Sequence, residues 1–271
     1  MQTTRVAEKR RWGTGSFRFW RSGADGGSGA AVAGRLPYGR ATFFICMNLP
    51  APIQLHLIRH GEVETSAHRV FGGSRIDSRL SDEGARQAAR LADYLRRVNY
   101  DKVYISPMRR AQLTAEPLLA GRGLQPGTLE GLREVDFGNW TGLRWEEVKE
   151  KHGLSAFQWL QQLSGPGFLD GEHENDVRGR VQASLDTILA DSAGKTVAVV
   201  CHGGIVRMAL SILTGLPLRS LEIIEVDYAS VTWVSVGEAR ETTVRNEIQL
   251  LNFTPWRDLD HPAEPEDQLP S

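Results

Sequence analysis

This 271-residue chain has few cysteines, no long apolar run and no large excess of either charge. Its two cysteines, Cys46 and Cys201, are too few for a disulfide framework, so we expect a reducing compartment, the cytoplasm. No stretch approaches the roughly 18 apolar residues that a membrane-spanning helix needs. The net charge of -1 indicates neither nucleic acid nor a membrane surface as a partner. The length allows one large domain or two small ones.

Residues 1–46 differ in composition from the rest of the chain. They are rich in arginine and glycine, poor in acids and without a sustained hydrophobic period, so we expect them to be disordered. A secretory signal needs an apolar core of roughly 7–15 residues, and none follows the basic cluster at residues 9–11. Composition alone would allow a transit peptide. We favour Met47 as the natural start, which makes residues 1–46 a disordered leader or an upstream extension.

From residue 53 onward, segments with strand character alternate with segments of helical period. We expect strands at 53–58, 102–105, 196–201, 221–226, 230–236 and 244–251. A helix follows the N-cap Ser81, a second follows Ser106 as N-cap with Pro107 in its first position, and Gly153 stops a short one. Further helices are expected at 176–190 and 203–212.

This alternation predicts a three-layer α/β/α domain with a mostly parallel central sheet, over residues 47–256. The segment between Glu134 and His202 predicts a small helical lid, and its aromatic residues are expected mainly to pack that lid, with one or two at the substrate mouth. The proline- and acid-rich residues 257–271 predict a flexible tail.

Polar clusters follow three of the expected strands: Arg59-His60, residues 106–110 and Cys201-His202. Ligands of such sheets bind at the carboxyl ends of the strands. Each cluster alone has an ordinary interpretation, such as a solvated histidine or a tight turn. Together, two histidines and two arginines form a cationic site for a dianion, and the glycines after His202 let the backbone approach the ligand.

Such a site suits phosphoryl chemistry without a metal. A neutral imidazole can attack phosphorus, and a second imidazole can hydrogen-bond the phosphoryl oxygens. One acid must protonate the leaving alkoxide. Glu134 is the best candidate by sequence context, and Asp136 is the nearest alternative.

The chain resembles the histidine phosphatase superfamily, in its phosphoglycerate-mutase-like branch. The resemblance is carried, in order along the chain, by "LIRHGE" (57–62), "FGG" with "RLSDEGARQA" (71–88), "SPMRRAQLTA" (106–115), "LREVDFGNWTG" (132–142) and "VVCHGGIVR" (199–207). These blocks cover nearly everything from Leu55 to Phe253.

The resemblance implies a role for each matched residue. His60 would become phosphohistidine, Glu134 would donate the proton, and Arg59, Arg110 and His202, with the Gly203 backbone, would hold the phosphate. Arg110, directly before Ala111, is the arginine that matches the motif. No cofactor and no metal are implied.

Two positions depart from the family pattern. Val63 stands where many members have Ser or Thr, and Ser66 stands where many have an Asn that helps to hold phosphate. Ser66 is therefore expected to be a weaker substitute in substrate binding. The departure bears on phosphate affinity and substrate identity.

The resemblance leaves the reaction open. "FGNWTG" and "GPGFLDGEHENDVRGRV" (165–181) are similar to phosphatase members such as α-ribazole phosphatase, which favours hydrolysis of a small phosphorylated metabolite. A cofactor-dependent mutase reaction, an inactive phospho-ligand-binding module and a metallophosphatase using His56 and His60 remain alternatives. The oligomeric state is also open, with a homodimer among the alternatives.

Overall fold

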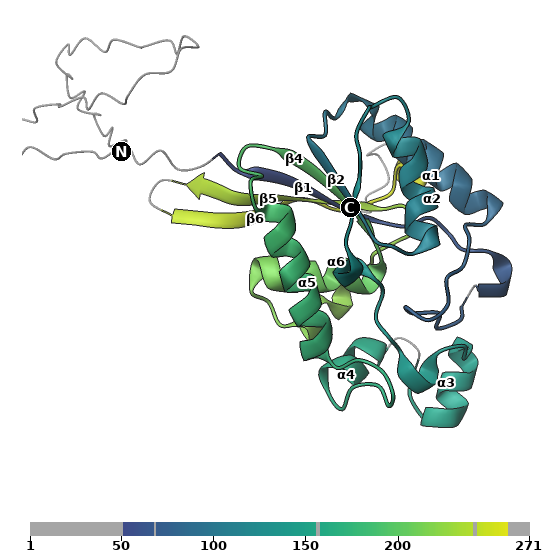
Figure 1. The fold of residues 1–271 in the computed structure, drawn as a ribbon. Helices are drawn as coiled ribbons and strands as arrows, with labels where there is room; N and C mark the ends of the chain where they lie inside the picture. The colour runs from purple at the N-terminus through teal and green to yellow at the C-terminus, as the bar shows by residue number, and fades with distance from the viewer. Residues whose placement is uncertain (1–50, 68, 156–157, 241–242, 260–271) are drawn as a thin grey trace, which may run out of the picture. The chain divides into compact units, whose positions relative to one another are not determined.

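A computed structural model describes residues 51–67, 69–155, 158–240 and 243–259 of the chain. A six-stranded sheet has the order β3-β2-β4-β1-β5-β6 (Figure 1). Its strands are β1 (Ile53–Arg59), β2 (Lys102–Ile105), β3 (Gly127–Thr128), β4 (Thr196–Cys201), β5 (Val231–Arg240) and β6 (Thr243–Phe253). Strands β3, β2, β4 and β1 are parallel, whereas β5 runs antiparallel to β1 and β6 antiparallel to β5. The predicted α/β architecture with a mostly parallel sheet is confirmed.

The central strands carry apolar side chains on both faces, as expected for strands covered on two sides. Leu55 and Leu57 of β1 belong to one buried cluster, and their neighbour Ile58 belongs to the other. The register pairs Leu57 with Val199 and Ile58 with Val200 of β4, so the alternation continues across the sheet. Each face therefore needs its own layer of helices.

Two groups of helices supply these layers. Helices α1 (Asp82–Tyr94) and α2 (Arg109–Leu119) cover the face with Ile58, and α5 (Glu174–Leu189) and α6 (Gly203–Thr214) cover the face with Leu57 (Figure 1). Ser81 caps α1 as predicted, because its side chain accepts a hydrogen bond from the Gly84 amide. None of the helices in the described ranges has the length and apolar character needed to cross a membrane.

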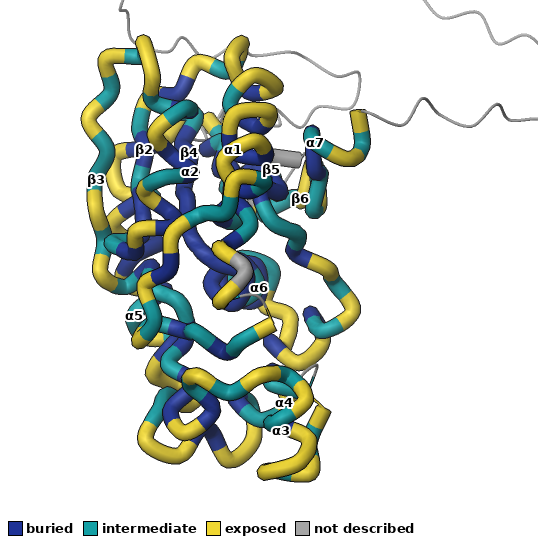
Figure 2. The backbone as a smooth tube through the Cα atoms, turned by 90° about the vertical axis from the view of Figure 1, so that its right-hand side faces the viewer, coloured by how far each residue is buried: buried dark blue, intermediate teal, exposed yellow. Residues whose placement is uncertain are grey.

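The predicted helical insertion lies between Glu134 and His202. It contains α3 (Trp145–His152), which ends at a left-handed Gly153, and α4 (Trp159–Ser164). Trp140 and Phe168 are buried inside it with their rings in edge-to-face contact, as expected of core aromatics. Trp145 and Trp159 are partly buried, and Phe157 lies outside the described residues. The residues of α3 other than Val148 are exposed or intermediate, and the colours along its tube in Figure 2 show this.

Two predicted local structures are wrong. Residues 221–226 were expected to form a strand, but Leu218–Ile223 form a 3-10 helix. Its buried residues, Leu218 and Leu221, are three apart, and Ile223 is 89% exposed, which a period of three explains and a period of two does not. Helix α2 begins at Arg109, with Met108 as N-cap, two residues after the predicted N-cap Ser106.

The ends of the chain bear on the predicted boundaries. A short helix, α7 (Pro255–Asp258), extends two residues past the expected boundary at 256. Residues 1–46 and most of the predicted tail lie outside the described residues. The leader, the domain limits and the flexible tail therefore stay predictions.

Candidate active site

A pocket of about 250 Å³ opens at the carboxyl ends of the parallel strands. Strand β1 ends at Arg59, and β4 ends directly before His202. Five of the predicted site residues line the pocket: Arg59, His60, Arg110, Glu134 and Gly203. The structure thus brings together residues that lie more than 140 positions apart in the sequence, from His60 to Gly203.

His60 follows the last residue of β1 and is 5% exposed. Its Nδ1 lies 2.8 Å from the Gly61 carbonyl oxygen, and the Arg110 Nε donates to its Nε2 at 3.2 Å. A carbonyl can only accept, so Nδ1 carries the proton and Nε2 presents a lone pair. Burial, with the charges of Arg110 and Arg59, lowers the His60 pKa well below 6.5, so the ring is neutral at pH 7.

The two predicted phosphate-binding arginines are held from different sides. Arg110 donates through Nη1 and Nη2 to the carbonyls of Ile76 and Gly73, and its Nε points at His60. Arg59 donates to the Val226 carbonyl, and its guanidinium lies 4.0 Å from the ring centroid of Tyr228. Its Nε is buried without a partner among the described residues. Both cations are therefore oriented before any ligand binds.

His202 is the N-cap of α6 and is fully buried, behind the residues that line the pocket. Its ring lies edge-on to His60, with the ring centroids 5.1 Å apart. Its Nε2 lies 2.7 Å from the Ser106 Oγ, while its Nδ1 has no partner in the described part of the chain. Burial, then the charges of Arg110, His60 and Arg59, lowers its pKa well below 6.5.

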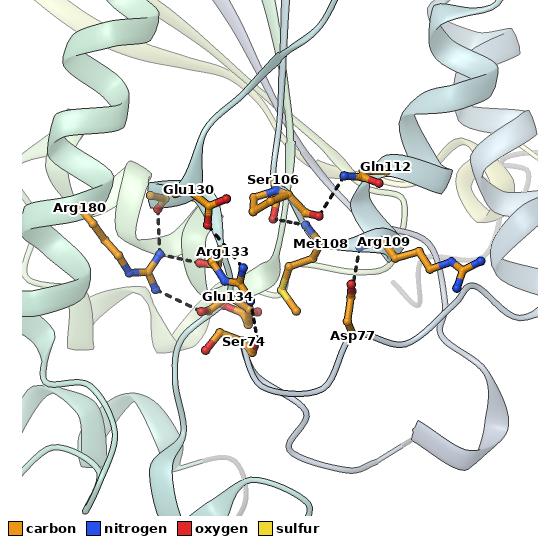
Figure 3. Close-up of polar contacts among 12 residues, drawn as sticks. Ser74, Asp77, Ser106, Met108, Arg109, Gln112, Glu130, Arg133, Glu134 and Arg180 are labelled. Atoms are coloured by element: carbon orange, nitrogen blue, oxygen red, sulfur yellow. Dashed lines mark hydrogen bonds and ion pairs between the residues drawn. The ribbon is translucent and has the colours of Figure 1, made fainter.

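Glu134 reaches the pocket from the loop between β3 and α3. Its carboxylate accepts from its neighbour Val135 at 3.0 Å and from the Gly204 amide, in the first turn of α6, at 3.3 Å. Figure 3 shows how Arg180 of α5 holds this loop, through hydrogen bonds to the carbonyls of Gly131, Arg133 and Glu134. The acid is thus anchored at its side chain and at its backbone.

Three weaker candidates lie outside this arrangement. Asp136, the alternative acid, forms an ion pair with Arg75 at 2.7 Å and does not line the pocket. Ser66 is exposed, and the pocket wall includes its neighbour Ala67 instead. The contact of Ser66 with substrate stays a prediction. Arg109 is exposed, in agreement with the choice of Arg110.

The sequence model of the histidine phosphatase superfamily (branch 1) matches residues 55–249, more than half of the chain. The chain belongs to the histidine phosphatase superfamily. The match contains every block that carries the resemblance found in the sequence, so the predicted family is confirmed.

Two curated relatives of this superfamily member have different names. One is phosphoserine phosphatase 1 of Hydrogenobacter thermophilus, 31% identical over 202 residues that cover 74% of this chain and 93% of the relative. The other is "Probable phosphoglycerate mutase GpmB" of Yersinia pestis, 30% identical over 202 residues that cover 68% and 89%. The family therefore leaves the reaction and substrate to be argued from the site.

Solved structures show the same fold. Mycobacterial glucosyl-3-phosphoglycerate phosphatase superposes with a TM-score of 0.66 at 24% identity, covering 73% of this chain and 98% of that one. The α-ribazole phosphatase of Shigella flexneri gives a TM-score of 0.63 at 24% identity, with 74% and 96% covered.

Several residues of the pocket were not predicted from the sequence. Arg207 lies four positions after Gly203 on α6, so helical spacing could have placed both on one face. Tyr228 comes from the loop before β5, where the Ala229 amide donates to the His60 carbonyl, and no sequence signal pointed to it. Trp145 and Trp159 line the mouth, as expected of one or two lid aromatics.

The metallophosphatase alternative would use His56 together with His60. His56 turns to the Tyr100 hydroxyl, 2.7 Å from its Nδ1, and is buried between Tyr100 and Trp233. Burial lowers its pKa to about 4. The residues that the structure describes contain no group of three His, Cys, Asp or Glu side chains placed to hold a metal ion.

Gly204 offers a test of the position of Glu134. A Cβ at residue 204 would lie 2.5 Å from the Glu134 Oε1, so Gly204→Ala must displace this carboxylate. We expect kcat for an alkyl phosphate to fall at least about 10-fold, a part of what a general acid contributes.

The matched control is Gly179→Ala, in the middle of α5, where an added Cβ meets nothing within 4 Å. It should keep full activity and a melting temperature at or above that of the wild type, since alanine favours a helix more than glycine does. Unchanged kinetics in Gly204→Ala would show that Glu134 need not occupy this position.

Proposed function

We propose that this protein is a phosphomonoesterase that passes the phosphoryl group of a small phosphorylated metabolite through His60 to water. The observation that supports this most is the state of His60. Its Nδ1–H is bound by a backbone carbonyl, its pKa is low, and its Nε2 lone pair lies in a pocket with arginines. A neutral, oriented imidazole is what attack on phosphorus requires.

In the first half-reaction, the phosphoryl group is held by Arg59, Arg110 and His202, with the backbone at Gly203 close by. The His60 Nε2 attacks phosphorus and forms an N–P bond as the P–O bond to the metabolite breaks. The protonated carboxyl group of Glu134 gives its proton to the departing alkoxide. The products are phosphohistidine and the free alcohol, and Glu134 is left as a carboxylate.

In the second half-reaction, water replaces the alcohol. The Glu134 carboxylate takes a proton from water as its oxygen attacks the phosphohistidine, and the N–P bond breaks. Inorganic phosphate leaves, His60 is neutral again, and Glu134 is protonated for the next cycle. No metal or cofactor takes part in these steps, and the positive charge comes from side chains.

Hydrolysis is favoured over transfer by the phosphatase relatives. The pocket volume of about 250 Å³ is at the small end for ligand sites, which supports a small phosphorylated metabolite as the substrate. Phosphoserine phosphatase 1 shares 31% of its aligned residues with this chain. The mutase alternative rests on the second relative and predicts an isomerised phosphoester with little free phosphate.

The test is a panel of phosphorylated metabolites, assayed for inorganic phosphate with and without excess EDTA. We expect release from at least one of them, at a rate that EDTA leaves unchanged, and inhibition by vanadate, which imitates five-coordinate phosphorus. Loss of activity in EDTA that zinc or magnesium restores would support the metallophosphatase. Isomerisation without net release would support the mutase, and saturable binding without turnover would support the binding module.

A further inference from the structure

Ser106 has an environment that its predicted role as an N-cap does not explain. It follows the last residue of β2, is 0% exposed and does not line the pocket. Its Oγ accepts a hydrogen bond from the Met108 amide at 3.3 Å (Figure 3) and lies 2.7 Å from the Nε2 of His202. A buried hydroxyl thus joins the second histidine of the site to the turn before α2.

The hydrogen bonds of this pair determine where the imidazole proton lies. A serine hydroxyl has one hydrogen to donate, and among the described residues His202 is the acceptor in reach of it. If the hydroxyl donates to Nε2, that nitrogen carries no proton, and a neutral ring must then carry its proton on Nδ1. The reverse arrangement leaves the hydroxyl hydrogen without an acceptor, which is costly in a buried site.

The other nitrogen of the same ring has the complementary property. The His202 Nδ1 is buried and has no partner in the described part of the chain. The ring lies 5.1 Å from that of His60, so a phosphoryl group held at His60 is within reach of it. An unprotonated Nδ1 would present a lone pair to anionic oxygens, whereas Nδ1–H would donate a hydrogen bond to them.

We propose that Ser106 is a positioning residue that holds His202 as the Nδ1–H tautomer and thereby makes this buried nitrogen a hydrogen-bond donor to the phosphoryl group. The donor role rests on the proposed function. Without the hydroxyl, a neutral His202 is free to place its proton on either nitrogen. A hydrogen bond from Nδ1–H to a charged phosphoryl oxygen then requires the proton to be on Nδ1, and selecting that tautomer costs free energy. The hydrogen bond therefore stabilises the transition state less.

The direct test is the tautomer of His202 in the resting protein. In protein with 15N-labelled histidine at pH 7.5, two-bond 1H–15N correlation spectra distinguish Nδ1–H, Nε2–H and imidazolium rings, and His202→Gln identifies the signals by their loss. We expect Nδ1–H, and we expect addition of inorganic phosphate or vanadate to shift the Nδ1 signal most. An Nε2–H ring or an imidazolium in the resting protein would overturn the proposal.

Variants of the serine provide the second arm. Ser106→Ala should move the His202 signals toward Nε2–H or an average of both tautomers and reduce kcat/KM roughly 10–100-fold, the range of one hydrogen bond to a charged acceptor. Ser106→Thr, which keeps a hydroxyl, should restore the Nδ1–H pattern and most of the rate. An Ala variant that folds, loses activity and retains a pure Nδ1–H pattern would show that Ser106 acts by other means.

The matched control is Ser192→Ala. Ser192 is also 0% exposed, but its hydroxyl donates to the Ile188 carbonyl at the end of α5. Its loss should lower the melting temperature and leave both the tautomer and kcat/KM unchanged. If the wild-type protein hydrolyses no phosphoester, the proposed function fails, yet the resting spectrum still decides the tautomer.

Discussion

Replacing His60 with alanine is expected to reduce turnover of every phosphoester substrate by at least about 10³-fold, because the variant cannot form the covalent intermediate. Brief mixing of the wild-type protein with 32P-labelled substrate, followed by quenching in alkali, should leave one phosphate on His60. Phosphoramidates of histidine are stable in base and labile in acid, so the label should disappear after acid treatment. Peptide mapping then places it on the segment that contains His60.

His56 supplies the control for this experiment. It is also buried, it lies on β1, the strand that His60 directly follows, and its ring bonds the Tyr100 hydroxyl outside the pocket. His56→Gln should lower stability but keep the label and most of the turnover. Substantial activity in His60→Ala would mean that water attacks phosphorus directly and that the covalent mechanism is wrong.

The low pKa of His60 leads to a prediction for the pH profile of the activity. Because its pKa in the free protein lies well below 6.5, the ring stays in its neutral, nucleophilic form as the pH falls from 8 to 6.5. The profile of kcat/KM, which reports the free enzyme, should therefore show no loss from His60 in this window. A loss that begins near 6.5 and follows the ionisation of a histidine would contradict the proposed neutral state.

Much of this arrangement can be predicted from the sequence because it depends on strand ends. An apolar run that stops at Arg59-His60 and another that stops at Cys201-His202 indicate two buried parallel strands. The ends of such strands meet at one edge of the sheet, and the structure places the two histidine rings 5.1 Å apart. The contact follows from local pattern and topology together.

Other features have no local signal. Tyr228 reaches Arg59 and His60 only because β5 pairs antiparallel with β1, and the sequence of the loop before β5 does not specify that contact. For Ser106 the sequence does contain a local signal, but the helix start that it predicts is wrong. Serine followed by proline is a typical helix start, and the Ser106 Oγ does accept from the Met108 amide, but α2 begins only at Arg109. The same hydroxyl lies 2.7 Å from His202 at the end of the neighbouring strand β4, and the sequence of the turn does not specify this contact.

The second large effect concerns Glu134. A proton donor matters most when the leaving group is a poor one. An alkoxide leaves badly without a proton, whereas p-nitrophenolate is stable enough to leave unaided. Glu134→Gln should therefore slow phosphorylation of His60 by roughly 10²–10⁴-fold with alkyl phosphates and only mildly with p-nitrophenyl phosphate. Rapid-quench measurement of the phosphoprotein is needed, because slow dephosphorylation would mask the difference in steady-state rates.

Glu225 makes a matched control, since it is the other carboxylate among the described residues that line the pocket. It is exposed, whereas Glu134 accepts hydrogen bonds from Val135 and from the Gly204 amide in the first turn of α6. Glu225→Gln makes the same chemical change in the same pocket and should slow both substrates alike, if at all. Equal slowing of both substrates by Glu134→Gln would remove Glu134 as the acid. A leaving-group dependence in Glu225→Gln would then transfer the role to Glu225, because Asp136 is paired with Arg75 away from the pocket.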